Sequence, residues 1–528
     1  MRKISFLLLL LWTITPCHAQ IPAIEKSAPV DVTFTSWNRL LQLKNGNTHY
    51  FSAGMRGMEV NVYDATRKIV AKQVIKSKYL KHRKMKRVFV AGLYEIGGQP
   101  VLFYWQAEKS KPVMYRMRFD AGNGSLVQEE RIGDMPEIKL MRRDGSDIYV
   151  EKDPATDNYA IIFFNGNTTK ITQRVRVIHY NGSHNVINAA YCTLPEDHDH
   201  QRYIGAVVDG DKRVFLASFA FNRDAKESSP VYISRLGVGD AAFFTKRLAL
   251  GQEMGRTASV MHYDRQTNAI RLLSAKLSSA KYPFGTPTFY YRAFLCYIDA
   301  EHLGLKSEKP ILNKKVNAYA MTTLGAEQGF AGVPQQMIMN ADMSITLLSE
   351  EITQTIVRTR STYNEYSVLG TMVISELDAE GNETDGYMIR KKQECDGLVE
   401  SMYMADRTRG KWYMKQGGDE HSSFAYIRTE KGKYIIFNDN RKNFDREEDD
   451  AKRKMARGLH QFEAACYKID EGGVKRSYLF GDPEKTDARH VVMITSAHQH
   501  PTTGVYATLL REYTDKGEAV RVAWLRFP

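Results

Sequence analysis

From Val32 onward, short apolar segments rich in Val, Ile, Tyr, Phe and Thr alternate with clusters of turn-forming residues. Examples of these clusters are Asn45-Gly46-Asn47, Gly122-Asn123-Gly124, Asn181-Gly182-Ser183 and Glu380-Gly381-Asn382. Short strands separated by such turns are typical of β-sandwiches, β-barrels and β-propellers. The pattern therefore predicts an all-β protein.

Amphipathic helical periodicity is almost missing from the sequence. The one convincing candidate is segment 447–462, where Met455, Leu459 and Phe462 are spaced to form a narrow apolar stripe among charged residues. We expect a helix over this segment.

Several apolar segments end in the same way, with aliphatic and aromatic residues running directly into Asp or Asn at a turn. Clear examples are segments 60–64, 114–120, 175–181, 295–299, 373–378 and 465–470. A β-rich chain contains some endings of this kind by chance, so the motif favours an internal repeat without proving one.

Grouping the apolar segments gives about seven or eight units, spaced by roughly 50 to 90 residues. The units begin near Asn38, Val88, Asp147, Tyr203, Gly255, Ala331, Leu398 and Ala488. A propeller blade of four strands needs about 40 to 50 residues, so each unit can hold one blade with insertions. We expect a single β-propeller-like domain of about seven or eight blades over residues 25–528, with a set of β-sandwiches as the alternative.

The N-terminal residues have the layout of a cleavable secretory signal, expected over residues 1–19. Arg2 and Lys3 precede an apolar run, and Ala19 stands in the last position before the expected cleavage. A transmembrane anchor is the alternative, but the run is much shorter than the roughly 20 residues that span a bilayer. A lipoprotein attached through Cys17 is disfavoured by Pro16. We therefore expect a periplasmic or cell-surface protein with no transmembrane segment in the mature chain.

Composition limits the classes of partner. Hydrophobic residues make up 43% of the chain, with 29 Tyr and 23 Phe, which is ample for a large core. The formal net charge of +13 is mild for 528 residues, and the dense basic run 81–87 is expected to be a solvated linker or a contact for an anionic surface. We expect no nucleic acid partner for an exported protein. The four later cysteines lie far apart, so isolated thiols and one or two disulfides both remain open.

The sequence shows no catalytic, cofactor or metal signature. It lacks a G-x-S-x-G nucleophile elbow and an H-E-x-x-H zinc motif. His198 and His200, like His498 and His500, have the alternate spacing that can place two metal ligands on one side of an extended segment. Solvated turns explain both pairs better, so we expect no metal site, no cofactor and no assignable catalytic residue.

Two polar stretches follow apolar strands in the second half of the chain. One is Lys391-Lys392-Gln393, and the other is Asn438-Asp439-Asn440 with Asn443. Asn and Asp at such places often only close a turn by bonding their own backbone. In a propeller, turns at one end of neighbouring blades converge on a single face. The sites predicted to lie together and bind an envelope protein or a polar or anionic ligand are Lys391, Lys392, Asn438, Asp439, Asn440 and Asn443.

These two stretches carry a resemblance. Ile389-Arg390-Lys391-Lys392-Gln393, followed by Phe437-Asn438-Asp439-Asn440 and Asn443, resembles a group of uncharacterised exported proteins of Bacteroidetes bacteria. The signal ending Ala19-Gln20 is similar to theirs, and the likeness covers about residues 341–470. It implies a periplasmic or surface β-propeller-like protein and brings no established activity with it.

The sequence favours a non-enzymatic binding or scaffold protein of the cell envelope, because propellers present many loops on rigid blades. The alternative is a hydrolase that acts on glycan or peptide with carboxylates gathered at the propeller centre. A deep central pocket with converging carboxylates would favour the hydrolase, and a flat polar face would favour the scaffold.

Overall fold

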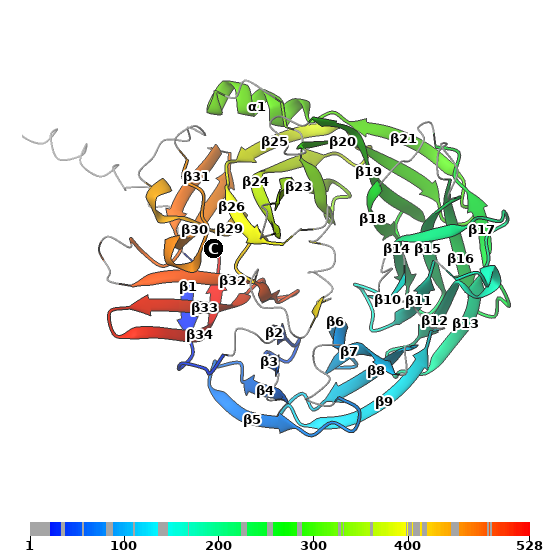
Figure 1. Ribbon diagram of the computed structural model, residues 1–528, viewed down its shortest axis with the longest axis horizontal. Coiled ribbons are helices and arrows are strands. Elements are labelled where there is room, and N and C mark those ends of the chain that lie inside the picture. The colour runs from blue at the N-terminus through cyan, green and yellow to red at the C-terminus, as the bar shows by residue number, and fades with distance from the viewer. Residues whose placement is uncertain are drawn as a thin grey trace, which may run out of the picture.

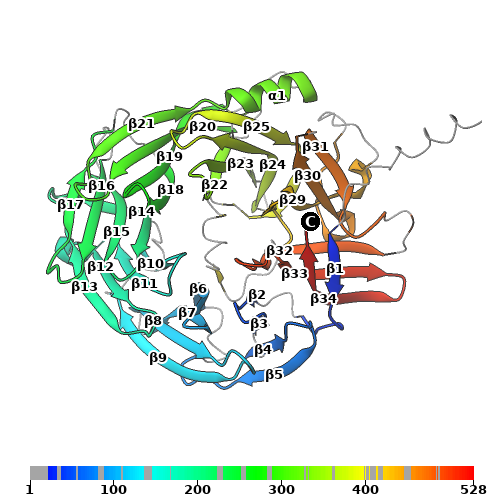
Figure 2. The same cartoon turned by 180° about the vertical axis from the view of Figure 1, so that it is seen from behind.

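A computed structural model shows eight antiparallel blades arranged in a ring, which confirms the predicted all-β propeller (Figures 1 and 2). The structure describes residues 22–32, 37–54, 57–80, 88–108, 111–135, 146–166, 168–222, 230–250, 257–281, 288–325, 329–330, 332–358, 363–397, 399, 404, 412–413, 420–444, 453–471, 473–482, 485 and 488–528. The expected signal over 1–19 and the basic run 81–87 lie outside these residues.

In each blade the strands follow one another outward, with the first strand nearest the centre of the ring (Figure 1). Blade 1 consists of β2 (Trp37–Gln42), β3 (Thr48–Gly54), β4 (Gly57–Tyr63) and β5 (Ile69–Ile75), and blade 2 of β6 (Val88–Ile96), β7 (Gln99–Glu108), β8 (Lys111–Phe119) and β9 (Leu126–Asp134). Blade 3 consists of β10 (Ser146–Lys152), β11 (Tyr159–Asn165), β12 (Val175–Tyr180) and β13 (Val186–Cys192), and blade 4 of β14 (His200–Asp209), β15 (Arg213–Phe221), β16 (Val231–Gly237) and β17 (Phe244–Arg247).

Blades 5 and 6 share one nine-stranded sheet, and blade 8 takes strands from both ends of the chain. Blade 5 consists of β18 (Thr257–Asp264), β19 (Ala269–Lys281), β20 (Thr288–Asp299) and β21 (Leu305–Ile311), and blade 6 of β22 (Val333–Met339), β23 (Ile345–Arg358), β24 (Tyr363–Leu377) and β25 (Glu383–Ile389). Blade 7 consists of β28 (Ala425–Thr429), β29 (Gly432–Asn440), β30 (Phe462–Asp470) and β31 (Gly473–Tyr478), and blade 8 of β32 (Arg489–Gln499), β33 (Tyr506–Thr514), β34 (Gly517–Arg526) and β1 (Ala23–Lys26). Short strands β26 (Gln393–Asp396) and β27 (Trp412–Tyr413) and 3-10 turns at Ile171–Gln173, Arg441–Asn443 and Leu459–Gln461 complete the described elements.

Strand β1 closes the ring by pairing antiparallel with β34 (Figure 2). The pairing continues at Ser27, whose main-chain amide donates to the carbonyl of Val522 at 2.9 Å. The side-chain oxygen of Ser27 accepts in return from the amide of Val522 at 3.0 Å. Because one blade contains both ends of the described chain, opening the ring requires breaking a sheet.

The predicted unit starts agree with the first strands of seven blades, each within three residues, from β2 at Trp37 to β32 at Arg489. The eighth predicted start, Leu398, is wrong, because the first strand of blade 7 begins at Ala425. An insertion that includes β26 and β27 separates blades 6 and 7. The hydrophobic pattern of this insertion looks like the beginning of a blade.

The recurrent Asp or Asn ending lies at equivalent places, where the third strand of a blade turns into the fourth. The strands concerned are β4, β8, β12, β20, β24 and β30. At Asp378 the carboxylate accepts from the amides of Glu380 at 3.0 Å and Asn382 at 2.8 Å. Gly381 in the same turn has a φ of +84°, which glycine adopts without steric cost. The motif therefore marks a true repeat, because a short side-chain acceptor closes the equivalent hairpin at Asp64, Asp120, Asn181, Asp299 and Asp378.

The helix expected over 447–462 is wrong for the part that the structure describes. Residues 453–458 are not helical, and Phe462 already begins β30. The main-chain amide of Glu394 donates to the carbonyl of Ala456 at 2.9 Å, so this segment lies along β26 instead. Tertiary pairing overrides a weak helical periodicity here. Residues 447–452 lie outside the described part of the chain.

One α-helix is found in the described residues, α1 (Lys314–Leu324), which lies over the outer strand β25 of blade 6 (Figure 1). Val316 and Ala320 form its buried side. A Cβ on Gly386 of β25 would lie 2.5 Å from the amide nitrogen of Val316, so a larger residue there would push the helix away. The helix covers an edge strand that would otherwise be open to pairing with another chain.

The core lies between the blades. Trp524 of blade 8 packs edge-on against Tyr63 of blade 1, with ring centroids 5.3 Å apart, and its indole N–H donates to the hydroxyl of Thr48 at 3.0 Å. The four cysteines after Cys17 are buried and not bonded to one another, so of the two readings left open the isolated thiols are confirmed. Among the described residues no helix has the length and hydropathy needed to cross a bilayer.

Candidate functional site

The two predicted binding stretches meet at the junction of blades 6 and 7. Lys391 and Gln393 follow β25, and Asn438 lies near the end of β29. The side-chain amide of Gln393 donates to the carbonyl of Asn438 at 2.7 Å, and the ammonium of Lys391 donates to Gln393 at 3.0 Å. The structure therefore places the two stretches within reach of each other.

Most of these side chains are occupied by other groups of the protein. Lys392 is half-buried, and the buried members are Lys391, Asn438, Asp439, Asn440 and Asn443. Lys391 forms an ion pair with Glu350, and Asp439 forms one with Arg453 at 2.5 Å. The first ion pair lies within blade 6 and the second within blade 7, while the hydrogen bond from Gln393 to Asn438 joins the two blades. Binding of a ligand by the six residues stays a prediction.

A second polar region lies at the centre of the ring, where blades 1 and 8 meet. We call it the inner-wall site and define it by Arg39, Glu420, His498 and Tyr506. Strands β2 and β32, the innermost of their blades, provide Arg39 and His498. Glu420 belongs to the insertion between β26 and β28. Since β27 of this insertion pairs with β6 of blade 2, the chain passes from blade 6 to blade 2 and returns to blade 7 (Figure 1).

A β-bulge in β32 connects these parts. The pairing of β32 with β33 shifts between Met493 and His498, which frees Thr495 for other contacts. The amide of Thr495 donates to the carbonyl of Glu420 at 3.0 Å. Its carbonyl accepts a hydrogen bond from the guanidinium of Arg39. The bulge therefore holds the insertion against the first and the last blade.

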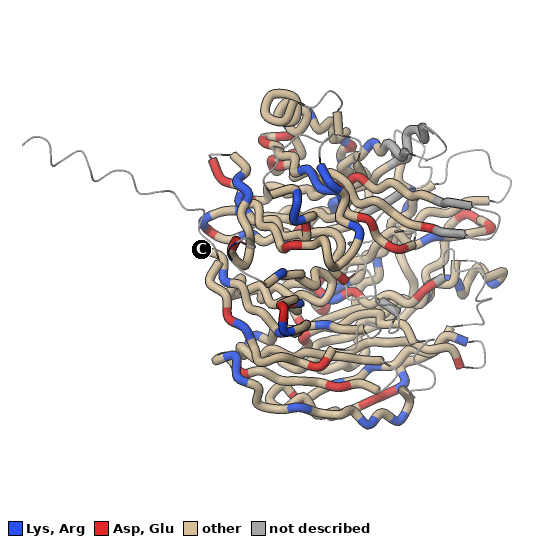
Figure 3. The backbone as a smooth tube through the Cα atoms, turned by 60° about the vertical axis from the view of Figure 1, so that its left-hand side comes forward, with Lys and Arg blue, Asp and Glu red and all other residues tan. Residues whose placement is uncertain are grey.

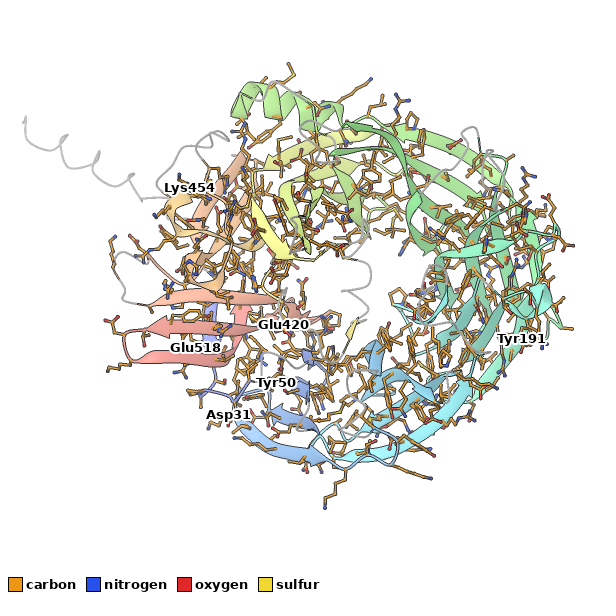
Figure 4. All side chains as sticks on the ribbon, viewed as in Figure 1. Asp31, Tyr50, Tyr191, Glu420, Lys454 and Glu518 are labelled. Carbon is orange, nitrogen blue, oxygen red and sulfur yellow. The ribbon has the colours of Figure 1, made fainter. Side chains whose placement is uncertain are left out.

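Glu420 has a buried carboxyl group, and few hydrogen bonds replace the hydration that the group loses on burial. It lies beside the centre of the ring, near the inner end of β32 (Figure 4). The side-chain amide of Asn38 reaches one of its oxygens at 3.4 Å, and the other oxygen, Oε2, has no partner among the described residues. Burial raises the pKa of Glu420 to about 8, so the group is protonated at neutral pH.

Arg39 is a desolvated guanidinium without an acidic partner in the described part of the chain. Its hydrogen bond goes to a main-chain carbonyl, that of Thr495. Burial lowers the pKa of Arg39 to about 10, partly offset by Tyr506 and Tyr94. The side chain is nevertheless half-buried and not fully enclosed, so solvent still reaches it.

Other arginines of the same protein have carboxylate partners, and positive and negative residues lie interspersed along the backbone in Figure 3. Arg213 and Arg235 both reach Glu301 at 2.9 Å, and Arg265 reaches Asp209 at 3.0 Å. Arg39 has no such carboxylate in the described residues.

His498 and Tyr506 add hydrogen-bond donors to the same wall. The main-chain amide of Gln42 donates to Nδ1 of His498 at 3.2 Å, so the neutral ring carries its proton on Nε2. Burial, with the fields of Arg39 and His500, lowers the pKa of His498 to about 3. The buried hydroxyl of Tyr506 has no partner among the described residues, and the charge of Arg39 acts on it.

Neither histidine pair singled out in the sequence is held as a pair of ligands. Nε2 of His198 lies 2.9 Å from the hydroxyl of Tyr232, while His200 packs against Phe221 with ring centroids 5.1 Å apart. Nε2 of His500 lies 3.0 Å from the carbonyl of Leu43. The described residues contain no group of three or more His, Cys, Asp or Glu placed to hold a metal ion.

Sequence reasoning missed the inner-wall site. Arg39 stands in the strand Trp37–Gln42, which also contains Asn38 and Gln42, and a single cation is an ordinary feature of such a strand. The signal that could have raised interest is a charged residue in a strand whose other side chains are largely buried. The sequence alone does not tell which partner such a charge has.

No protein-family model matches the sequence, and no curated protein matches it. Similar solved structures include prolyl oligopeptidase B from Galerina marginata, at 8% identity and a TM-score of 0.40 over 93% of this chain and 56% of that one. The α-L-arabinanase of Penicillium chrysogenum matches at 13% identity and a TM-score of 0.31, over 62% of this chain and 93% of that one. Polysaccharide lyase Uly1 matches at 11% identity and a TM-score of 0.35, over 83% and 89%.

This chain thus spans little more than half the length of the oligopeptidase. All three TM-scores lie below 0.5, so these likenesses carry no argument about activity. The propeller itself is established by the strand pairing of the eight blades.

Proposed function

We propose that this chain is an exported, non-enzymatic binding protein of the bacterial cell envelope, and that it holds an anionic ligand at the inner-wall site. One observation carries the proposal. Burial removes much of the hydration of Arg39, but its side chain is half-buried and solvent still reaches it in part. No carboxylate of the described residues neutralises its charge.

The physical argument concerns the cost of a charge without a partner. Withdrawing a guanidinium from water is unfavourable unless an opposite charge or several hydrogen bonds replace the lost hydration. Arg39 has one hydrogen bond to a neutral carbonyl. An anion from outside would supply the missing charge, and each charge-assisted hydrogen bond contributes on the order of 1.5–3 kcal/mol. The site is also held in place before binding, because its strands belong to packed blades, and this reduces the entropy lost on binding.

Export is supported by the N-terminal pattern. Mass spectrometry of the protein purified from its native cell should give a mature N-terminus at Gln20. A chain that retains residues 1–19 and fractionates with the cytoplasm would contradict this part of the proposal.

The binding function is tested by the small molecules that remain with the protein. The wild type, Arg39→Gln and the control Arg526→Gln are purified from the native envelope, denatured, and their released anions identified by mass spectrometry. Arg526 is a suitable control because it is exposed at the end of β34. We expect an anion in the wild type and the control and its loss from Arg39→Gln. The proposal fails if all three samples release the same molecules.

Glu420 supports a second candidate, a hydrolase that uses this carboxyl as a general acid. Its pKa of about 8 keeps the proton available at neutral pH, and an acid of this kind is what glycosidic cleavage requires. The test is turnover of glycan and peptide substrates by purified wild type and by Glu420→Gln. Turnover that Glu420→Gln abolishes would replace the binding proposal, whereas equal turnover by both proteins would exclude Glu420 as the acid.

A further inference from the structure

We infer that the ligand of the inner-wall site is a monocarboxylate, gripped by Arg39 as the charged group with the imidazole of His498 as a neutral donor. This inference rests on the proposed anion-binding function and goes further by naming the chemical class of the ligand. It follows from the charge that the site can offer and from the hydrogen bonds that its histidines already make.

Two arginines act on the groups of the site, and one of them, Arg511, whose field acts on Glu420, is paired with Glu518. The remaining positive charge is a single one. Arg39 provides it, and the fields that act on Arg39 come from Tyr506 on β33 and Tyr94 on β6, both uncharged at neutral pH. Glu420, the acid of the site, is protonated and therefore adds no negative charge below about pH 8. A ligand with one negative charge is neutralised by this set, whereas a dianion leaves one charge uncompensated in a desolvated place.

His498 is kept neutral by the contacts of its own ring. Nδ1 accepts from the amide of Gln42, so a proton on Nδ1 would turn this hydrogen bond into a clash of two donors. The carbonyl of His498 also accepts from the side chain of Gln42 at 2.7 Å, which fixes the strand beside the ring. The charged and titratable groups that act on the ring are Arg39 on β2 and His500 in the following turn.

The ring of His500 is held by hydrogen bonds to the main chain. Its Nδ1 accepts from the amides of Thr502 and Thr503, both at 3.1 Å, so the proton lies on Nε2. Nε2 in turn donates to the carbonyl of Leu43 at 3.0 Å. The ring is thus a structural link between blades 8 and 1.

The neutral donor matches a carboxylate. Nε2–H of His498 has no partner in the described part of the chain, and His498 is half-buried, so a ligand can reach it. The hydroxyl of Tyr506 is likewise without a partner among the described residues, but it is buried behind the site. A guanidinium with one spare neutral donor supplies hydrogen bonds to both oxygens of one carboxylate, whereas phosphate and sulfate bring a second charge that nothing here neutralises.

The experiment measures binding by isothermal calorimetry at constant ionic strength, with purified mature protein from which endogenous ligand has been dialysed. The probes are glucuronate and N-acetylalanine, as a sugar acid and an amino-acid carboxylate, against sulfate and inorganic phosphate. Glucose serves as the uncharged control. We expect at least one carboxylate to bind about tenfold or more tightly than either sulfate or phosphate at pH 7.5. The stronger of the two carboxylates shows which source of the group the site prefers.

Two further readouts identify the residues. Carboxylate affinity should fall at least tenfold in Arg39→Gln and only a few-fold in Tyr506→Phe. It should stay constant between pH 5.5 and 7.5, because His498 does not titrate in that range. Circular dichroism and the unfolding midpoint establish that each variant is folded, and Arg39→Lys provides a second variant that keeps the charge.

The outcomes distinguish a failure of the carboxylate inference from a failure of the proposed anion-binding function. Sulfate or phosphate binding as tightly as the carboxylates, with loss in Arg39→Gln, would overturn the ligand class and leave the anion site standing. Carboxylate affinity that rises steeply toward pH 5.5 would overturn the neutral role of His498. Absence of anion binding, or binding unchanged in a folded Arg39→Gln, would overturn both.

Discussion

The main-chain amide of Gln42 donates a hydrogen bond to Nδ1 of His498 at 3.2 Å, and the side chain of Gln42 donates to the carbonyl of the same histidine at 2.7 Å. This pair of bonds joins the innermost strand of the first blade to that of the last. It also decides the tautomer of His498. The two bonds therefore connect the first blade to the last and also fix the ring nitrogen that His498 offers to the inner-wall site.

The first prediction concerns Arg39 in the absence of ligand. Arg39→Met should leave the free energy of unfolding unchanged or raise it by about 1–2 kcal/mol, because it removes a desolvated charge that has no acidic partner in the described residues. Urea unfolding of the ligand-free protein measures this.

Arg116→Met is the matched control for Arg39→Met. Arg116 is buried and paired with Glu130 at 2.7 Å, so its loss should lower stability by about 1.5–3 kcal/mol. Equal destabilisation by the two substitutions would show that Arg39 is satisfied within the protein.

The second prediction is a pH dependence caused by Glu420. The folded-state pKa of about 8 lies above the ordinary value of 4.5, so the folded protein retains a proton that the unfolded chain releases. Stability from this group is complete below about pH 4.5 and falls by about 1.4 kcal/mol per pH unit until about pH 8. The group contributes no further change above that.

Glu420→Gln should remove this slope, because the amide does not titrate. Urea unfolding at pH 5, 6, 7 and 8.5 gives the difference between wild type and variant as a function of pH. Parallel curves for the two proteins would mean that the carboxyl is ionised in the folded state at neutral pH.

The third prediction separates two neighbouring lysines. Lys391 is buried and paired with the buried Glu350, so Lys391→Met breaks a buried ion pair and should cost about 3–5 kcal/mol. Lys392 is half-buried and has no ion pair in the described residues, so Lys392→Met should cost less than about 0.5 kcal/mol. Thermal unfolding compares the two, and similar losses would argue against a structural role specific to Lys391.

The fourth prediction concerns the thiols. Burial raises the pKa of Cys466 to about 12 and that of Cys192 to about 11, so neither forms a reactive thiolate near neutral pH. The native mature protein should react with almost none of a thiol reagent, and all four cysteines should react after denaturation. A reducing agent should leave the unfolding midpoint unchanged. Fast reaction of the folded protein would contradict the burial of these side chains.

The six expected binding residues show which features of a site can be predicted from the sequence and which cannot. Sequence reasoning predicted that Lys391 and Asn438 lie close together, as they do, but it placed Asn438 after a strand, whereas Asn438 belongs to β29 itself. It did not show that Glu350 pairs with Lys391 or that Arg453 pairs with Asp439. Arg453 is 14 positions from Asp439, Glu350 is farther from Lys391, and no local pattern marks either partner. Burial of five of the six residues was therefore decided by tertiary packing.

The sequence by itself determined the all-β class, the repeated blade and the turns at residues such as Asp378, because alternating side chains and turn acceptors act over a few residues. The helix expected near Met455 failed for the complementary reason, since a contact with β26 outweighed a weak local preference. Only the tertiary structure decided the inner-wall site. Arg39 bonds to a residue 456 positions away, and its missing counter-charge is a property of everything that surrounds it in space.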